Sequence, residues 1–322
     1  IQAWAPTIFW LFVGRIFSGI TGASITTASA YIADISDDSN RSKNFGMIGA
    51  AFGLGFIIGP VIGGLLGQFG SRVPFYAAAV LCLVNFAYGY FILPESLGKE
   101  HRRPFEWKRA NPVGSLLKVR THPEILKLFI AWFLVYLASH AVQTNWAYFT
   151  MYKFAWDEKT VGISLGVMGA FTAFVQGFLI RKVHPKLGSE RSILYGIMFY
   201  CTGMLLFAFA QKEWMMYAIL AIYCLGGIAG PALQSVISSK VSPKEQGDLQ
   251  GALTSVISIT SIIGPLLMTQ IFYFFTHPDA KIKLLTLELK PPFQFSGAPF
   301  FLGFVLMAVS AYFVYYVFHR KK

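Results

Sequence analysis

The sequence has little charge and few residues that build covalent or metal-bound frameworks. Charged side chains make up 13% of its 322 residues, whereas a soluble domain carries about 25%. Each of its three cysteines lies inside an apolar run, which excludes a disulfide framework and a paired-cysteine metal site. Six histidines are scattered without an HExxH motif, which argues against a zinc site. This composition fits neither a soluble enzyme nor a disordered chain.

Long apolar stretches are what the sequence has instead. Apolar residues make up 55% of the chain, and nine runs of at least 19 residues contain no Asp, Glu or Lys. Each run is long enough to cross a hydrocarbon core of about 30 Å as a helix, and lipid leaves no other way to satisfy the backbone of a single segment. The sequence therefore predicts an all-α integral membrane protein. The runs cover residues 7–33, 45–68, 74–94, 128–149, 160–180, 192–210, 214–239, 249–276 and 298–318.

The basic residues predict how these helices are oriented. Of 27 Lys and Arg, 18 lie at the C-terminus or in loops that follow odd-numbered runs, and seven lie on the other side. Because Lys and Arg accumulate in cytoplasmic loops, we expect Ile1 outside and the C-terminus in the cytoplasm, in a multi-pass protein of the cell inner (cytoplasmic) membrane. The net charge of +12 follows from this rule, and no nucleic-acid partner is expected.

An internal repeat divides the chain. An offset of 205 residues brings the IIGP at Gly59-Pro60 onto the IIGP at Gly264-Pro265 and sets Gly22 on Gly227. Repeated halves are the signature of transporter bundles. We interpret residues 1–96 as the remainder of an N-terminal bundle, 97–127 as a basic cytoplasmic linker and 128–322 as a six-helix C-terminal bundle. Three runs precede the linker and six follow it, so the symmetry predicts three further helices upstream of Ile1. An anionic-lipid or nucleic-acid patch is the alternative reading of the linker.

Several segments resemble one family closely. Arg15 and Gly19 match the R-x-x-x-G of the fourth helix of the major facilitator superfamily, in its drug:proton antiporters of the tetracycline-resistance type. The fifth-helix antiporter motif, G-x-x-x-G-P-x-x-G-G, is matched by Gly55, Gly59, Pro60, Gly63 and Gly64. The resemblance implies a major facilitator fold of twelve helices, of which this chain holds helices 4–12. It also implies gating by the antiporter motif, which we extend to Gly264 and Pro265 in the second half.

Arg15 is the strong charge deep within a run, and such a group is a functional candidate by default. Family resemblance implies that it takes part in proton coupling; a backbone-paired structural Arg is the alternative. Asp34, in the family pattern AYIAD, and His140, the histidine within a span, are further candidates for proton coupling. A His titrates near neutral pH, although a neutral, hydrogen-bonded His140 explains the sequence equally well.

Polar and aromatic side chains within the later runs are candidates for a central substrate cavity, although each alone is more often a contact between helices. These candidates are Gln143, Asn145, Trp146, Thr172, Gln176, Tyr200, Pro231 and Gln234. Tetracycline exporters commonly carry a His and an acid where this sequence has Thr172 and Tyr200. The second half therefore lacks a membrane-embedded carboxylate, which argues against tetracycline itself as the substrate and shifts proton coupling toward the first half.

Together these features predict a secondary active transporter, not an enzyme, that exports small amphipathic compounds or drugs in exchange for protons by alternating access. Its partners would be a small-molecule substrate, protons and the lipid bilayer. It would need no cofactor beyond the proton motive force and would work as a monomer. A proton-coupled importer of a sugar, peptide or siderophore on the same fold is the alternative, against which the antiporter motif argues.

Overall fold

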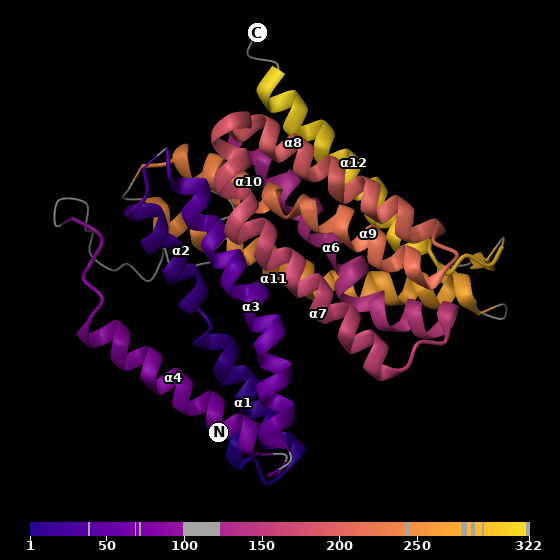
Figure 1. Cartoon of the computed structure of the whole chain (residues 1–322), viewed down its shortest axis with the longest axis horizontal. Coiled ribbons are helices and arrows are strands. Elements are labelled where there is room, and N and C mark those ends of the chain that lie inside the picture. The colour runs from indigo at the N-terminus through magenta and orange to yellow at the C-terminus, as the bar shows by residue number, and fades with distance from the viewer. Residues whose placement is uncertain are drawn as a thin grey trace.

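The computed structural model describes residues 1–37, 39–67, 69–70, 72–98, 123–242, 245–277, 282–284, 287–291 and 293–319. Most of this described chain is helical, which confirms the all-α class (Figure 1). The main helices are α1 (Ile8–Ile20), α2 (Ser24–Asp34), α3 (Arg41–Gly67), α4 (Val73–Phe91), α6 (Pro123–Phe154), α7 (Glu158–Phe174), α8 (Ile180–Phe209), α9 (Glu213–Leu225), α10 (Ala229–Ser239), α11 (Gln246–Thr276) and α12 (Ala298–His319). Short helical turns are η1 (Gln2–Trp4), η3 (Val175–Leu179) and η4 (Gly226–Ile228).

Hydropathy places nearly all of these helices in the membrane. Seven segments of the described chain are long and apolar enough to span it. One of them, Thr160–Phe209, has 50 residues, which is about 75 Å as one helix and far exceeds the hydrocarbon core. Gly188 divides it with a φ of 73°, a conformation that a residue without Cβ adopts freely. If this segment is counted as two spans and α3 is added to the seven segments of the described chain, the total is the nine predicted spans.

The internal repeat appears in the bounds of the helices. Adding 205 to the first and last residues of α1 and α2 gives the first and last residues of α9 and α10. The break between α1 and α2 falls at Thr21–Ala23, and the same offset places η4 in the second copy. α11 likewise begins 205 residues after α3. Both copies therefore interrupt one membrane-spanning run at the same point, although the sequence suggested a continuous helix there.

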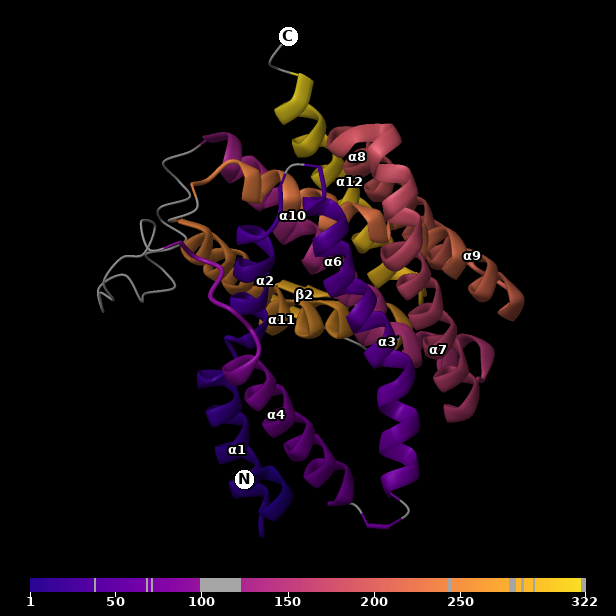
Figure 2. The same cartoon turned by 60° about the vertical axis from the view of Figure 1, so that its left-hand side comes forward.

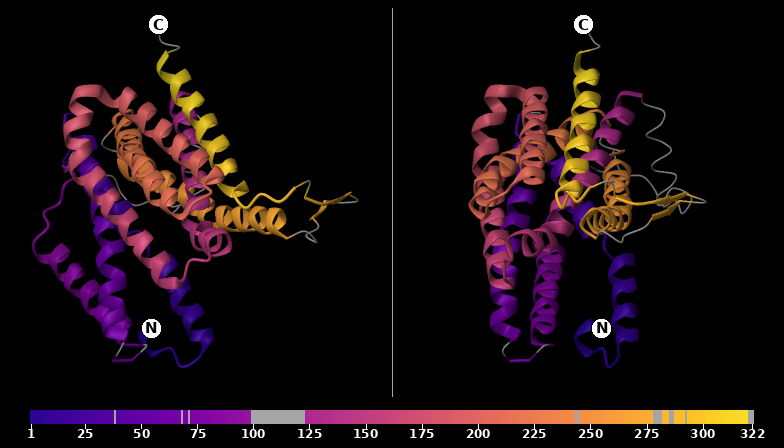
Figure 3. Two further views of the ribbon diagram at one scale, coloured as in Figure 1. Left: turned by 45° about the vertical axis from the view of Figure 1, so that its right-hand side comes forward. Right: turned by 90° about the vertical axis from the view of Figure 1, so that its right-hand side faces the viewer.

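The hydrophobic core lies in the part of the chain after residue 122. α12 packs along α6 and α8, and α11 packs along α6 (Figure 3). Large side chains fill the space between them: Trp132, Trp146, Phe149, Phe207 and Phe300 are almost fully buried. In contrast, α1 buries only Gly14 and α4 buries none of its described residues. The helices before the linker therefore expose most of their apolar surface.

The strands of the described chain lie between α11 and α12. β1 (Ile282–Leu284) pairs antiparallel with β2 (Leu287–Leu289), with Ile282 opposite Leu289. The larger part of the predicted linker, residues 99–122, lies outside the described residues.

Candidate functional site

The helices on either side of the linker meet where α2 ends and α3 begins; we call this the contact end (Figure 2). It joins residues 1–98, the N-terminal segment, to residues 123–319, the C-terminal bundle. Hydrogen bonds between described residues join the two: Thr26 Oγ1 with Thr254 Oγ1 (2.9 Å), Arg41 Nη1 donating to Ser238 Oγ (3.2 Å) and Ser42 Oγ with His184 Nε2 (2.8 Å). These polar pairs give the contact end a directional connection in addition to packing.

The loop before α3 places Arg41 at this contact. Asp37 accepts hydrogen bonds from the Ser39 hydroxyl and from the backbone N–H groups of Ser39 and Asn40. The Ser39 hydroxyl bond, followed by the backbone bonds, lowers the pKa of Asp37 because all of them stabilise the carboxylate. Arg41 Nη2 also donates to the Ser36 carbonyl at 3.0 Å. The guanidinium is thus fixed on its own segment while it reaches across to the C-terminal bundle.

Glycines allow α3 to approach the C-terminal bundle closely. A Cβ on Gly53 would lie 2.9 Å from the backbone nitrogen of Ala173, and a Cβ on Gly46 would lie 3.0 Å from the carbonyl oxygen of Gln176. A Cβ on Gly49 would overlap the side-chain amide of Gln176. Real Cβ atoms avoid such distances, so α3 packs backbone against backbone here, as small residues permit in membranes.

The two helices separate beyond this contact. Gly166 lies seven residues before Ala173 and therefore on nearly the same face of α7. No described atom lies within 4 Å of the position that a Cβ would occupy on Gly166, and the same holds for Gly162 nearer the start of α7. Figure 2 shows the second half of α3, with α1 and α4, leading away from the C-terminal bundle. Among the described residues, the close contacts between the two parts are thus found at one end.

Three of the antiporter-motif glycines have no described neighbour in that interface. Gly55, Gly59 and Gly63 have no described atom within 4 Å of their Cβ positions, and neither has Gly19 in α1. Pro60 and Gly64 belong to α3, but their surroundings lie outside the described part of the chain. The resemblance drew attention to these positions, whereas the close contact uses Gly46, Gly49 and Gly53. A small residue every three or four positions in NFGMIGAAFG was the available signal.

His140 and Gly264, two separate candidates, lie together. His140 is 7% exposed, and a Cβ on Gly264 would overlap its ring. Gly264 precedes Pro265, which lies inside α11 and lacks the N–H that would continue the helical ladder. The imidazole of His140 therefore lies beside Gly264, next to the proline of α11. At this proline one backbone hydrogen bond of the helix is missing. A titratable ring thus contacts α11 where the helix is least constrained.

Arg15 and Asp34 lie apart. Arg15 is exposed on α1, and no hydrogen bond or ion pair joins it to another described residue. Asp34, the last residue of α2, accepts a hydrogen bond from the Ser96 hydroxyl at 2.9 Å. Ser96 follows α4, so this bond ties the end of α2 to the segment after α4. Asp34 thus lies close to the contact end, away from Arg15 in the preceding helix.

Thr172, Gln176 and Tyr200 line the region where α7, η3, α8 and η4 meet. Thr172 Oγ1 donates to the Met168 carbonyl at 2.8 Å and lies 3.9 Å from the sulfur of Cys224. The Tyr200 ring packs against Tyr223 with centroids 4.8 Å apart, and it fills the space beside Gly226. These residues place hydroxyl, amide, thiol and aromatic groups around η4, a set that we call the patch around η4.

Gln234 and Pro231 lie on α10 near the contact end. Gln234 Nε2 donates to Gln250 Oε1 on α11 at 2.8 Å, while the Gln250 amide nitrogen is buried without a described partner. Pro231 is buried within α10. Gln143 is exposed on α6 and bonds to Ser139. Of these candidates, Gln143 is the one that presents its side chain to a surface.

Asn145 and Trp146 are buried inside the C-terminal bundle. The Trp146 indole N–H donates to Ser164 Oγ at 2.8 Å, and its ring meets Phe207 edge to face. Asn145 is fully buried, and neither atom of its amide has a described partner. The sequence alone did not indicate that this side of α6 would face the neighbouring helices.

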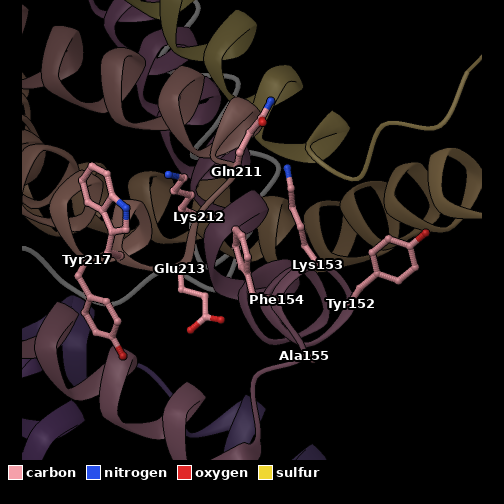
Figure 4. A pocket seen from close by; sticks show the side chains of 9 residues that line it. Tyr152, Lys153, Phe154, Ala155, Gln211, Lys212, Glu213 and Tyr217 are labelled. Atoms are coloured by element: carbon pink, nitrogen blue, oxygen red, sulfur yellow. The ribbon is translucent and has the colours of Figure 1, made fainter.

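A separate cavity of about 880 Å³ lies at the end of α6 and the start of α9 (Figure 4). Lys153 and Lys212 extend to one side of it, whereas Glu213 points the other way. None of the predicted substrate residues lines this cavity. Among the described residues, no group of three or more His, Cys, Asp or Glu is placed to hold a metal ion.

Comparisons with known proteins agree with this architecture. The family model described as Major Facilitator Superfamily matches residues 1–265. The tetracycline resistance protein of class C from Escherichia coli is 39% identical over 272 residues, which cover 84% of this chain and 68% of that protein. The class G protein from Vibrio anguillarum is 36% identical, with 84% and 69% covered.

Solved structures show the same fold at low identity. The human organic anion transporter MFSD10 (TETRAN) superimposes with a TM-score of 0.83 at 20% identity, covering 98% of this chain and 73% of that chain. The transporter FucP in the outward conformation gives a TM-score of 0.65 at 13% identity, with 91% and 72% covered.

Proposed function

This chain belongs to the major facilitator superfamily, and we propose that it is a secondary active transporter that exports small amphipathic compounds or drugs in exchange for protons. The observation that supports this most directly is the close contact between the N-terminal segment and the C-terminal bundle at one end. In the described part of the chain, the two parts approach closely at the contact end, while α1, α4 and the second half of α3 lead away from the C-terminal bundle at the opposite end (Figure 2). A transporter working by alternating access needs such a one-sided seal.

The distribution of charge supports an orientation for this seal. If the basic loops and the C-terminus lie in the cytoplasm, the contact end is cytoplasmic and the opposite end faces outside. We therefore propose that the structure represents an outward-facing conformation in the cell inner membrane. Residues 1–96 and 128–322 would form the two moving parts, joined by the basic linker, and a single chain would suffice.

Proton coupling in this scheme involves Arg15, His140 and Asp34. His140 is suited to it because its ring lies against Gly264, beside the proline of α11, so a change in its charge acts on a bendable point. Arg15 supplies a fixed positive charge within the membrane. Asp34 lies at the contact end, where a carboxylate exchanges protons with the cytoplasm. No organic cofactor is required, since the proton motive force supplies the energy.

The substrate class follows from the relatives and from the patch around η4. Relatives at 39% and 36% identity are named for tetracycline resistance, which supports efflux over import. The patch of Thr172, Gln176 and Tyr200 offers uncharged hydrogen-bonding groups and an aromatic face. Such a surface suits flat, amphipathic molecules. Since it carries no carboxylate, metal-chelated or cationic drugs would need a charge from elsewhere.

Transport into inverted membrane vesicles tests the proposal. The full-length gene product that contains residues 1–322 would be expressed in an efflux-deficient strain, and uptake of tetracycline and of fluorescent amphipathic dyes would be followed after energisation. We expect uptake that a protonophore abolishes and that Arg15→Gln removes. Arg72→Gln, which removes the same charge from an exposed position that bonds only to the Ala5 carbonyl, serves as the control. Uptake that is insensitive to the protonophore would refute proton exchange.

A further inference from the structure

We propose that Gln176 is a positioning residue for transport: its side chain fits into the notch left by Gly49 of α3 and sets how readily the contact end opens. This inference rests on the proposed function insofar as transport requires the contact end to open and close. Gln176 is one of the cavity candidates, but the geometry gives it a role between the moving parts.

The Gln176 side chain is held between two elements, α3 and η4. It extends from η3, a π-helical turn between α7 and α8, and such turns are frequent at functional sites. On one side its carboxamide occupies the space where Gly49 would carry a Cβ. On the other side its Nε2 and Cγ lie 3.4 and 3.5 Å from the Cβ position of Gly227 in η4. Any residue larger than glycine at position 49 would displace it.

The fit is steric and is not reinforced by a hydrogen bond to the amide oxygen. Gln176 Oε1 is buried and has no described partner. A buried carbonyl oxygen without a donor loses its hydration with no compensation. Opening the contact end would return water to this oxygen, so the closed arrangement pays a penalty that the open one avoids. Close backbone packing at Gly46 and Gly53 favours closure, and the Gln176 oxygen opposes it.

Such an opposition suits a contact that must form and break in every cycle. An apolar side chain of the same size would complete the packing without the desolvation penalty and would hold the two parts together for longer. A side chain on Gly49 would have the reverse effect, because it would compete with the Gln176 amide for the same space. Gln176 and Gly49 therefore set the equilibrium between the closed and the open contact end, and substitutions at the two positions shift it in opposite directions.

Disulfide trapping across a different pair of helices measures this equilibrium without substrate. Thr26→Cys and Thr254→Cys, whose hydroxyl oxygens lie 2.9 Å apart on α2 and α11, would be placed in a background with the three native cysteines replaced by alanine. We expect Gly49→Ala to slow cross-linking about tenfold through overpacking. The double variant Gly49→Ala/Gln176→Ala should return to within about twofold of the parent, because truncating the amide removes the overlap. Gly89→Ala in α4, with no described atom near its Cβ position, is the matched control.

Gln176→Leu provides an independent test should Gly49→Ala fail to fold. We expect faster cross-linking and several-fold slower transport turnover, since the closed contact loses its desolvation penalty. Unchanged cross-linking in Gly49→Ala, no recovery in the double variant, or a Gln176→Leu protein that behaves like the parent would each overturn the proposal. Because the trapping needs neither substrate nor protons, a failure of the transport assay alone would count against the proposed function and not against this inference.

Discussion

Replacing Arg41 by Gln tests whether the polar pairs of the contact end contribute to its closure. Arg41 makes one hydrogen bond across the interface, to Ser238 Oγ at 3.2 Å, and one within its own segment, to the Ser36 carbonyl. Only the first is lost when the two parts separate. A hydrogen bond to a charged group contributes about 1.5–3 kcal/mol net, and the length of this one places it at the lower end. A loss of about 1.5 kcal/mol corresponds to roughly a tenfold shift in the equilibrium from the closed toward the open contact end.

The distance between spin labels across the contact end measures this shift. Labels at Ile35 and Ser239, both exposed, would report a short-distance population that falls in Arg41→Gln by about tenfold relative to the long-distance population. Lys43→Gln removes the same charge two residues further on, from an exposed side chain that makes no hydrogen bond to a described residue. An unchanged distribution in Arg41→Gln would contradict the reasoning, and so would an equal shift in Lys43→Gln, since general electrostatics would then explain both.

Three further substitutions test other contacts. Gly264→Ala should have a free energy of unfolding in detergent about 1–3 kcal/mol lower than that of Gly59→Ala. Both variants gain the same helix propensity, but the new methyl group of Gly264→Ala would overlap the His140 ring. Equal free energies of unfolding would contradict this. Gly59→Ala should nevertheless slow vesicle uptake several-fold if its face seals the opposite end, and a normal rate would remove the motif from gating. Ser164→Ala leaves the buried Trp146 indole N–H without an acceptor, which should cost about 1–3 kcal/mol by thermal unfolding; Ser164→Thr, which keeps the hydroxyl, should not.

The membrane-spanning helices were predictable because lipid imposes one solution on a long apolar segment. The helix breaks were not, because a hydropathy window averages over them. The run of residues 7–33 is interrupted at Thr21–Ala23 and the run of 214–239 at η4, yet both remain apolar throughout. The offset of 205 residues that set Gly22 on Gly227 pointed to these two places, since each glycine lies at its break.

The candidate site was predicted less completely, because a polar side chain within a span can face a cavity, the inside of its own bundle or a helix of the other part. Trp146 and Gln176 both read as cavity residues, but the Trp146 indole finds Ser164 inside the bundle, whereas Gln176 reaches across to α3. The difference depends on the direction each side chain takes from its helix. The π-helical turn η3 sets that direction for Gln176, and no pattern in the sequence indicated such a turn.

The glycines of α3 form two sets that face in different directions. A helix turns by about 100° per residue, so Gly46 and Gly53 point in nearly the same direction, while Gly55 lies half a turn away from Gly46. Gly59 lies about 40° from Gly55 on that second face. The first face carries the contact with Ala173 and Gln176, and the second has no described neighbour. Two smooth faces on one helix permit two close contacts, and a substitution on one face should leave the other intact. Gly49→Ala and Gly59→Ala should therefore impair transport for different reasons: only the first should slow disulfide trapping at the contact end.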